Sequence, residues 1–281
     1  MMIKGNNPEN IRVGSTLSTD EFAGLRFDFM LSNPPYGKSW SSEQKYIKDG
    51  KDIIDSRFIV KLKDYWGTEE DADATPRSSD GQLLFLMEMV NKMKPTSENL
   101  VGSRIASVHN GSSLFTGDAG GGESNIRRYI IENDMLEVII QMPNNLFYNT
   151  GITTYIWLLS NNKVPQRKGK VLLIDASQRY QKLRKNLGDK NCEFSPAHIR
   201  EIVNIYEKGQ EVERQGEDGI AAKVFDNADF GYYKVTVERP KRLKAQWRAP
   251  EAASEAGTYL PRASPKWSAH KIRTRSTGLD I

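Results

Sequence analysis

Short apolar runs alternate along this chain with longer stretches of helical periodicity, a pattern that predicts an α/β fold. The apolar runs have strand length, and most are bounded by Gly, Pro, Asn or Ser. Strands are predicted at residues 11–17, 27–31, 101–109, 136–142, 153–160, 170–177 and 229–240. Helices are predicted at residues 82–94, 125–133 and 196–208.

Two parts of this pattern already constrain how the elements pack. The helix at 82–94 has one apolar face, which makes it a core helix that ends at Pro95. The residues on that face are Leu83, Leu84, Leu86, Met87 and Val90. The link between the strands at 136–142 and 153–160 is too short for a parallel crossover, so these strands are expected to pair antiparallel.

Two segments depart from the pattern and suggest the domain organisation. Residues 37–80 are polar, with scattered Trp and Tyr and no lasting period, which predicts either a functional lid or a mobile surface loop. Residues 245–281 are rich in Ala, Ser, Arg and Pro, and a disordered tail is predicted there. The chain is thus divided into a main α/β part at 1–165, an extension at 166–244 and the tail.

Composition narrows the class of protein without pointing to one function. The chain has 281 residues, 38% of them hydrophobic, which is enough for a sizeable core. The net charge of +4 permits nucleic-acid binding but argues for it only weakly. A single cysteine excludes a disulfide framework, and the three histidines lack metal-ligand spacing. No apolar run is long enough to span a bilayer, so a reduced cytoplasmic protein is expected.

The strand at 27–31 leads directly into Asn33-Pro34-Pro35-Tyr36, the most informative stretch of the chain. Two successive prolines cannot donate to a sheet ladder, and each favours extended geometry in the residue before it. The strand therefore stops, and its tip is expected to present the Asn33 carboxamide and the Pro34 carbonyl at the edge where α/β sheets bind ligands.

Such a tip suits a group with two donor hydrogens. A carboxamide oxygen and a fixed carbonyl are two acceptors at a short, rigid spacing, and they match the hydrogens of an exocyclic NH₂. The Tyr36 ring next to them is placed to stack on a flat base. The structural alternative is a strand ended by a Pro-Pro pair with no function, and we consider the functional interpretation the better one.

Other polar residues are weaker candidates. The basic stretch at 179–187, with Lys182, Arg184 and Lys185, is expected either to contact phosphates or to form a solvated charged face. Arg127 and Arg128 lie on a helix after a glycine-rich loop at 116–124 that lacks the spacing of a nucleotide-binding loop. His109 is interpreted as a hydrogen-bonded histidine at a strand end rather than a ligand.

The order of elements around Asn33–Tyr36 resembles the second half of a class I methyltransferase domain. More closely, the chain resembles the modification subunit of type I restriction–modification systems, over roughly residues 1–244. The stretches that carry the resemblance are 33–40, 77–82, 102–106, 110–115, 122–128 and 147–152. The resemblance implies a partial Rossmann-like sheet, with residues 1–165 as the carboxyl-terminal part of the catalytic domain and 166–244 as an extension that contacts subunits or DNA.

The function implied by the resemblance is methylation of the N6 amine of adenine in DNA, with S-adenosylmethionine as methyl donor. Asn33, Pro34, Pro35 and Tyr36 are then the catalytic residues, with no metal. Phe147 is expected to stack on the other face of the base or, equally, to be a core aromatic, and Arg127, Arg128 and the three basic residues at 182–185 to contact DNA. The partners implied are double-stranded DNA, a specificity subunit and a second methylase subunit, with a restriction subunit as a further candidate.

The chain departs from this family at the cofactor. No glycine-rich cofactor loop precedes Ile11, and only Ser15 and Thr16 are candidates for a weak cofactor contact. We interpret the chain as truncated in front, with a sheet that lacks its first two strands and leaves the 27–31 strand with an open apolar edge, which favours aggregation. The chain alone is therefore expected to be inactive and to bind S-adenosylmethionine weakly or not at all, which calorimetry can check.

Two other functions are open at this point. The first is a methyltransferase that uses the same tetrapeptide on RNA or on a protein amide, although such enzymes are usually more compact than a chain with the 37–80 insertion. The second is an inactive remnant that binds a partner subunit through residues 178–240. Methylation assays on the competing substrates separate the first, and co-purification without methylation supports the second.

Overall fold

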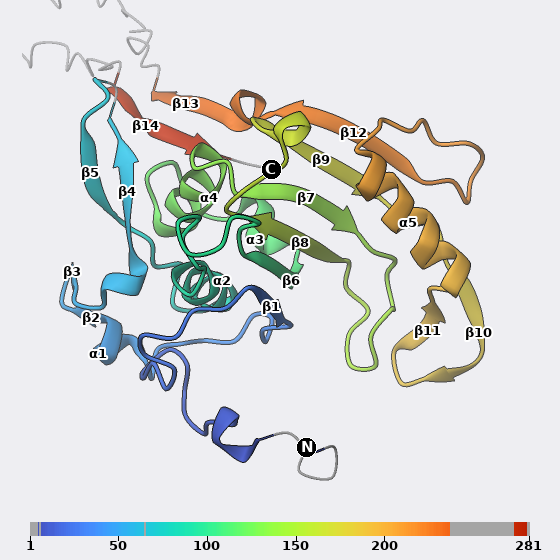
Figure 1. The fold of residues 1–281 in the computed structure, drawn as a ribbon, viewed down its shortest axis with the longest axis horizontal. Coiled ribbons are helices and arrows are strands. Elements are labelled where there is room, and N and C mark those ends of the chain that lie inside the picture. Colours follow the sequence, from blue (N-terminus) through green and yellow to red (C-terminus); the bar gives the residue numbers. More distant parts are fainter. Residues whose placement is uncertain (1–4, 6, 65, 237–272, 280–281) are drawn as a thin grey trace, which may run out of the picture.

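A six-stranded mixed sheet lies at the centre of the computed structural model, which describes residues 5, 7–64, 66–236 and 273–279 (Figure 1). The strand order is β1-β6-β8-β7-β9-β12. The strands are β1 (Phe29–Ser32), β6 (Arg104–Asn110), β8 (Thr154–Ser160), β7 (Leu136–Gln141), β9 (Lys170–Asp175) and β12 (Ala221–Asp226). The α/β class predicted from the apolar pattern is confirmed.

Strand directions decide where a ligand can meet the sheet. β1 is parallel to β6 and β7 is parallel to β9, while β8 runs antiparallel between β6 and β7, as its short link to β7 predicts. β12 is antiparallel to β9. β1, β6, β7 and β9 therefore all end at one edge of the sheet, which we call the carboxyl edge.

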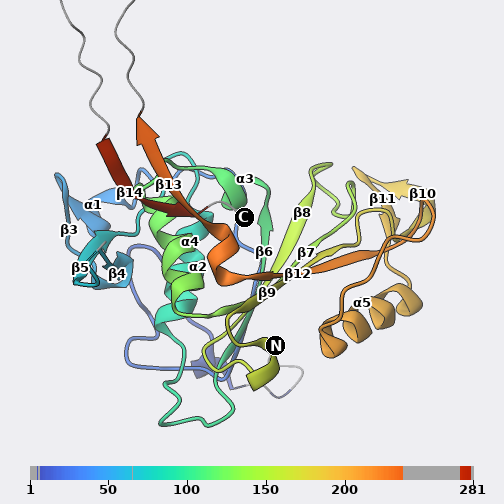
Figure 2. The ribbon, with the colours of Figure 1, turned by 90° about the horizontal axis from the view of Figure 1, so that it is seen from above.

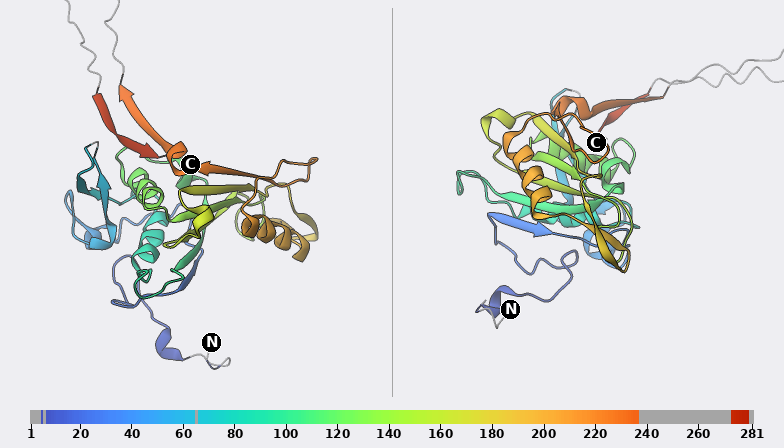
Figure 3. Two further views of the ribbon diagram at one scale, coloured as in Figure 1. Left: turned by 45° about the horizontal axis from the view of Figure 1, so that its top comes forward. Right: turned by 90° about the vertical axis from the view of Figure 1, so that its right-hand side faces the viewer.

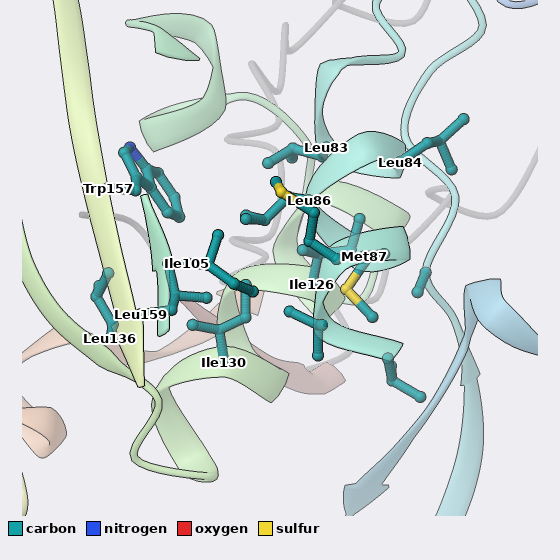
Figure 4. Packing of buried hydrophobic residues seen from close by; sticks show 14 of the residues in the cluster. Leu83, Leu84, Leu86, Met87, Ile105, Ile126, Ile130, Leu136, Trp157 and Leu159 are labelled. Carbon is teal, nitrogen blue, oxygen red and sulfur yellow. The ribbon is translucent and has the colours of Figure 1, made fainter. Parts of the chain in front are cut away.

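Helices cover the two faces of the sheet unequally (Figures 2 and 3). α2 (Gln82–Asn91) and α4 (Gly122–Glu132) lie on one face, and α5 (Pro196–Lys208) lies on the other. All five apolar residues that the sequence placed on the core face of α2 are buried. They pack with α4 and with the strand residues Ile105, Trp157 and Leu159 (Figure 4).

The second face is covered at one end only. Ile202 of α5 packs with Val138, Leu172 and Ile174, and Ser195 begins the helix by accepting a hydrogen bond from the His198 amide. At the other end, Phe29 and Leu31 of β1 are 74% and 86% exposed. β1 is thus an edge strand that is apolar and open, as expected from the sequence.

The strand predicted at 11–17 is not formed. The described chain has a short 3₁₀ turn at Pro8–Asn10 followed by turns and irregular backbone up to β1. A lone strand leaves its backbone groups unpaired, and β1 pairs only with β6 among the described strands. Without a neighbouring strand, an Ile-Arg-Val run has nothing to stabilise it as a strand.

Residues 37–64 and 66–80 form secondary structure that packs on the main core, in place of an irregular surface loop. They contain α1 (Gln44–Ile47), β2 (Lys48–Asp49), β3 (Asp52–Ile53), the 3₁₀ turn Ser56–Phe58, β4 (Ile59–Lys63) and β5 (Glu69–Asp73). β4 and β5 pair antiparallel, and Phe58, Val60 and Leu62 are buried in the main core. The sequence hid this hairpin because β4 is short and β5 is acidic, a composition with low strand propensity.

One glycine of the glycine-rich loop, Gly122, is required by close packing. A Cβ at this position would lie 1.7 Å from the Thr75 carbonyl oxygen, so only glycine lets the start of α4 approach the 37–80 segment this closely. α4 therefore begins at Gly122, three residues before the start predicted from the sequence, and Ser124 is buried. The role of Gly122 is therefore to allow this close contact with the backbone of Thr75.

The remaining elements extend the fold on both sides. α3 (Ser112–Phe115) follows β6, and β10 (Gln181–Leu187) and β11 (Lys190–Glu193) form a hairpin after β9. β13 (Gly231–Thr236), within the strand predicted at 229–240, pairs with β14 (Arg273–Leu279) beside α4 (Figure 1). Most of the predicted disordered tail lies outside the described residues, and where it is described it forms β14. None of the described helices is long and apolar enough to cross a membrane.

Candidate active site

The Pro-Pro corner lies at the carboxyl edge, as predicted, because Asn33 follows the last residue of β1. Asn33 and Pro35 are exposed, whereas Pro34 is buried and Tyr36 is partly buried. Gly37 has a φ of +58°, which lets the chain turn sharply after Tyr36. The corner therefore places the Asn33 carboxamide in solvent on a backbone held by the prolines.

A hydrogen bond orients this carboxamide. The Tyr36 hydroxyl donates to Asn33 Oδ1 at 2.5 Å. Burial raises the pKa of Tyr36 above its usual value, so the phenol keeps its proton at neutral pH and remains a donor. An amide oxygen accepts two hydrogen bonds, so Asn33 Oδ1 can accept a second one from a ligand while Tyr36 holds the group in place.

The loop behind the corner is anchored on residues 77–81. The Trp40 amide donates to the Ser78 carbonyl oxygen at 3.0 Å, and the Trp40 indole Nε1 donates to the Arg77 carbonyl oxygen at 2.9 Å. The Gly81 amide donates back to the Lys38 carbonyl oxygen at 3.0 Å. Trp40 is also buried, so both hydrogen bonds and apolar packing hold the chain that follows Tyr36.

His109 lies in the neighbouring strand β6 and is fully buried. Its Nδ1 is 3.2 Å from Gln82 Oε1, which confirms the prediction of a hydrogen-bonded histidine near a strand end. Its ring stands 5.2 Å from the Trp157 indole, centroid to centroid. Burial lowers the pKa of His109 to about 3, so the imidazole is neutral at physiological pH.

A pH-dependent loss of stability is expected from His109. The unfolded chain binds a proton there near pH 6.5 and the folded chain only near pH 3, so stability falls as pH drops between these values. Between pH 7 and pH 5, the free energy of unfolding in urea should fall by about 2 kcal/mol more in the parent chain than in His109→Gln. The same pH slope in both proteins would contradict a neutral buried imidazole.

Ser15 and Thr16, the predicted cofactor contacts, lie at the opposite edge of the sheet. Both are exposed in a turn, and the Thr16 carbonyl accepts a hydrogen bond from Arg57 Nη1 at 2.9 Å. Arg57 pairs with Glu88 in the second half of α2. The start of α2 is at the carboxyl edge, and at the usual rise Glu88 lies about 9 Å further along the helix axis than Gln82. The structure does not bring Ser15 or Thr16 near Asn33.

Arg127 and Arg128 do not face a DNA-binding surface. Arg127 is fully buried, and its Nη1 donates to the carbonyl oxygens of Thr116 at 2.8 Å and of Ser113 at 3.2 Å. Arg128 is also buried; its Nε pairs with Glu132 at 2.7 Å and its Nη2 donates to the Lys63 carbonyl. Their guanidinium groups hold loops onto α4, which argues against the predicted phosphate contacts.

Phe147 lies in the loop between β7 and β8, partly buried, in an isolated bridge with Thr150. This loop rests on the β10–β11 hairpin, where the Asn191 amide donates to the Asn145 carbonyl oxygen at 3.1 Å (Figure 1). The loop joins strands that lie two and three positions from β1, roughly 10–14 Å away. No described contact joins Phe147 to the corner, and its stacking role stays a prediction.

The β10–β11 hairpin carries the other predicted DNA contacts. Lys182, Arg184 and Lys185 are all exposed. The ion pairs found among the described residues include none of the three. The hairpin follows the end of β9 and therefore lies on the side of the carboxyl edge, about 19 Å from β1 by the strand order.

Sequence reasoning missed two buried polar residues of this site, Asp80 and Gln82. Both lie in the stretch 77–82 that carries the family resemblance, and Gln82 begins the predicted helix at 82–94, but the sequence assigns neither a role in the site. Both are at most 7% exposed; Gln82 bonds to Asn110 at the end of β6, and Asp80 accepts from Ser112 at the start of α3. The available signal was polarity at the start of a helix that is otherwise apolar.

Comparisons with known proteins agree with this geometry. A family model described as N-6 DNA Methylase matches residues 1–245. The chain is 26% identical over 240 residues to the type I restriction enzyme MjaIX methylase subunit of Methanocaldococcus jannaschii, covering 83% of this chain and 38% of that one. It is 29% identical over 160 residues to the HindI methylase subunit of Haemophilus influenzae, covering 55% and 33%.

Solved structures give the same result for the fold. The methyltransferase subunit of a type I restriction–modification system from Streptococcus thermophilus superposes with a TM-score of 0.61 at 25% identity, covering 82% of this chain and 41% of that one. A modification subunit of a putative type I restriction enzyme from Vibrio vulnificus has a TM-score of 0.55 at 16% identity, covering 79% and 38%. The chain spans about two fifths or less of the length of these relatives.

Proposed function

The chain belongs to the N-6 DNA methylase family, and from this premise we propose that it carries the target-base site of a type I restriction–modification methylase subunit. The proposed reaction is methyl transfer to the N6 amine of adenine in DNA. The observation that supports it is the exposed Asn33 carboxamide, oriented by Tyr36 at the carboxyl edge. Family membership favours DNA over RNA or a protein amide as the substrate.

The corner acts by positioning an amine. The target adenine leaves the duplex stack at a cost of a few kcal/mol. Asn33 Oδ1 and the Pro34 carbonyl oxygen accept the two hydrogens of its exocyclic amine, which favours a pyramidal nitrogen whose lone pair points out of the ring plane. The Tyr36 ring stacks on the base, while its hydroxyl keeps the carboxamide in place.

Family membership alone supports S-adenosylmethionine as the methyl donor. The described residues do not fit it, since Ser15 and Thr16 lie at the opposite edge of the sheet and are exposed in a turn. When bound, the donor supplies the methyl group. Asn33, Pro34 and Tyr36 bind and orient the base.

The test uses the full chain, alone and together with the subunits that co-purify with it from its own cells. Each sample is incubated with labelled S-adenosylmethionine and with unmethylated genomic DNA, so that no recognition sequence has to be known. N6-methyladenine, measured by mass spectrometry, is expected with the assembled subunits. Its absence in an assembly that binds DNA would refute the proposed function.

We propose that the β10–β11 hairpin contacts DNA phosphates. Replacing Lys182, Arg184 and Lys185 by Gln is expected to weaken DNA binding equally for all sequences. The slope of log K against log salt should fall by up to about 3, because each phosphate contact contributes close to 0.9. Fluorescence anisotropy at several salt concentrations measures both quantities.

A matched control removes three basic side chains from the opposite edge of the sheet. These are Arg26, Lys168 and Lys170, all exposed in the structure. This control should leave the salt slope unchanged. An equal fall in the slope for both triple variants would contradict a specific role for the hairpin.

We propose that the partners are a specificity subunit and a second methylase subunit, with a restriction subunit as a further candidate. Named relatives of the chain are methylase subunits of type I restriction enzymes.

An apolar surface on α5 also favours the second candidate function, a subunit-binding module without catalysis. This surface contains Ile199 and Val203, which lie one turn apart on α5 and are 50% and 42% exposed. Co-purification with a specificity subunit without any methylation would favour that function.

A further inference from the structure

Gln82 lies at a junction between the start of α2, the end of β6 and the start of α3. It is the first residue of α2 and only 2% exposed. Its Nε2 lies within hydrogen-bond distance of three side-chain oxygens, and its Oε1 accepts from the Asn110 amide at 3.2 Å. The three oxygens are Asp80 Oδ2 at 2.8 Å, Asn110 Oδ1 at 2.6 Å and Ser112 Oγ at 3.0 Å. One buried side chain thus holds the last residue of β6 and the first residue of α3.

The surrounding donors and acceptors allow one orientation of this amide. The Asn110 backbone N–H needs an acceptor, so the group facing it is Oε1, and Nε2 faces the carboxylate of Asp80. Since Oε1 carries no hydrogen, His109 Nδ1 must be the donor in their 3.2 Å contact. His109 therefore carries its proton on Nδ1, and Nε2 of the ring has no partner among the described residues.

The other side of the junction is the loop behind Asn33–Tyr36. Asp80 accepts from the Gln82 side chain and from Ser112 Oγ, each at 2.8 Å, so it belongs to the same network. Its neighbour Gly81 donates to the Lys38 carbonyl oxygen at 3.0 Å. A Cβ on Gly81 would lie 3.1 Å from the Trp40 ring, so this segment and the loop are also in tight contact. Contacts therefore continue from the end of β6 to the residues directly after Tyr36.

We propose that Gln82 is a positioning residue that fixes the end of β6 relative to the Asn33–Tyr36 corner. Gln82 Oε1 accepts from the Asn110 amide and from His109 Nδ1, and Asp80 and its neighbour Gly81 carry the contact on to the loop at 38–40. This inference deepens the proposed function, since its consequence for catalysis depends on Asn33 and Tyr36 acting on a base. The two acceptors must both meet hydrogens of one amine, so they tolerate little displacement. Hydrogen bonds behind the loop would hold them in place.

The first test is independent of methylation. Gln82→Met keeps the volume of the side chain and removes its hydrogen bonds. Hydrogen exchange of the folded full chain is then measured by NMR or mass spectrometry. We expect exchange at least about 10-fold faster at Asn110 and also at Gly81 and Trp40, whose amides donate to Lys38 and Ser78.

A matched control is Asn91→Ala, at the other end of α2. Asn91 Nδ2 donates to the carbonyl oxygens of Arg57 at 2.8 Å and Met87 at 2.9 Å, so this variant also loses two hydrogen bonds. It should leave exchange at Trp40, Gly81 and Asn110 unchanged. Faster exchange at Asn110 alone in Gln82→Met would overturn the proposal, because Gln82 would then hold only β6. If Gln82→Met does not fold, Ser112→Ala replaces it, with the same pattern expected at smaller size.

The second test measures catalysis in the assembled methylase. Gln82→Met is expected to lower kcat at least about 10-fold and to change KM for DNA less than about twofold, since it touches no DNA-facing residue. A rise in KM with unchanged kcat would contradict positioning. If the parent assembly shows no methylation, the proposed function fails, and hydrogen exchange still decides the role of Gln82.

Discussion

Replacing Asn33 by alanine is expected to lower kcat for adenine methylation at least about 100-fold in the assembled enzyme, the usual scale for loss of one aimed polar group in an active site. Asn33 Oδ1 is one of two acceptors proposed to hold the target amine. Because Asn33 is exposed and, among the described residues, its side chain hydrogen-bonds to Tyr36 alone, the free energy of unfolding should change by at most about 0.5 kcal/mol. Single-turnover methylation and urea unfolding measure the two effects.

Two control variants separate the carboxamide from its surroundings. Tyr36→Phe keeps the stacking ring and removes only the hydroxyl that orients Asn33, so a loss of about 10-fold or less is expected. Asn204→Ala removes another exposed asparagine, on α5, and should have no effect. Full activity of Asn33→Ala would show that the corner does not act on the base.

Replacing Arg127 by methionine is expected to lower the free energy of unfolding by about 3 kcal/mol or more. The guanidinium is fully buried and donates to the carbonyl oxygens of Ser113 and Thr116. Methionine fills much of the space and donates nothing, so these carbonyls lose a charged donor inside the protein. Urea unfolding of both proteins at pH 7 measures the difference.

Arg26→Met is the matched control for Arg127. Arg26 pairs with Glu98 at 3.3 Å in an exposed position, where an ion pair is worth at most about 1 kcal/mol. The comparison also decides between two roles of Arg127. If Arg127→Met kept full stability and weakened DNA binding, the predicted phosphate contact would be right and the structural role wrong.

Local patterns in the sequence were sufficient to predict the elements that bury themselves by their own periodicity. α2 was predicted because its apolar residues recur at helical spacing, and β6, β7, β8 and β9 because their apolar runs end at polar residues. The corner at 33–36 was predictable for a stronger reason. Two prolines restrict the backbone whatever surrounds them, so Asn33 ends the strand in any fold that contains it.

The position of each polar candidate depended on contacts distant in sequence. Arg127 looks like a surface arginine on an amphipathic helix, yet the carbonyls that surround it come from residues 11 and 14 positions earlier. Ser15 precedes the corner by a short stretch of chain, but contacts of its turn with Arg57 hold it at the opposite edge. A pattern of polarity shows that a side chain needs a partner, and it does not show which partner.

The α/β class, the main helices and strands and the Asn-Pro-Pro-Tyr corner can all be predicted from local sequence, because periodicity and proline act over a few neighbouring residues. Tertiary contacts alone account for the packed β4–β5 hairpin, the burial of Arg127 and the hydrogen bond from Gln82 to Asn110 at the end of β6. These features depend on side chains that meet across 10 to 30 positions or more of the chain, and folding is what brings them into contact.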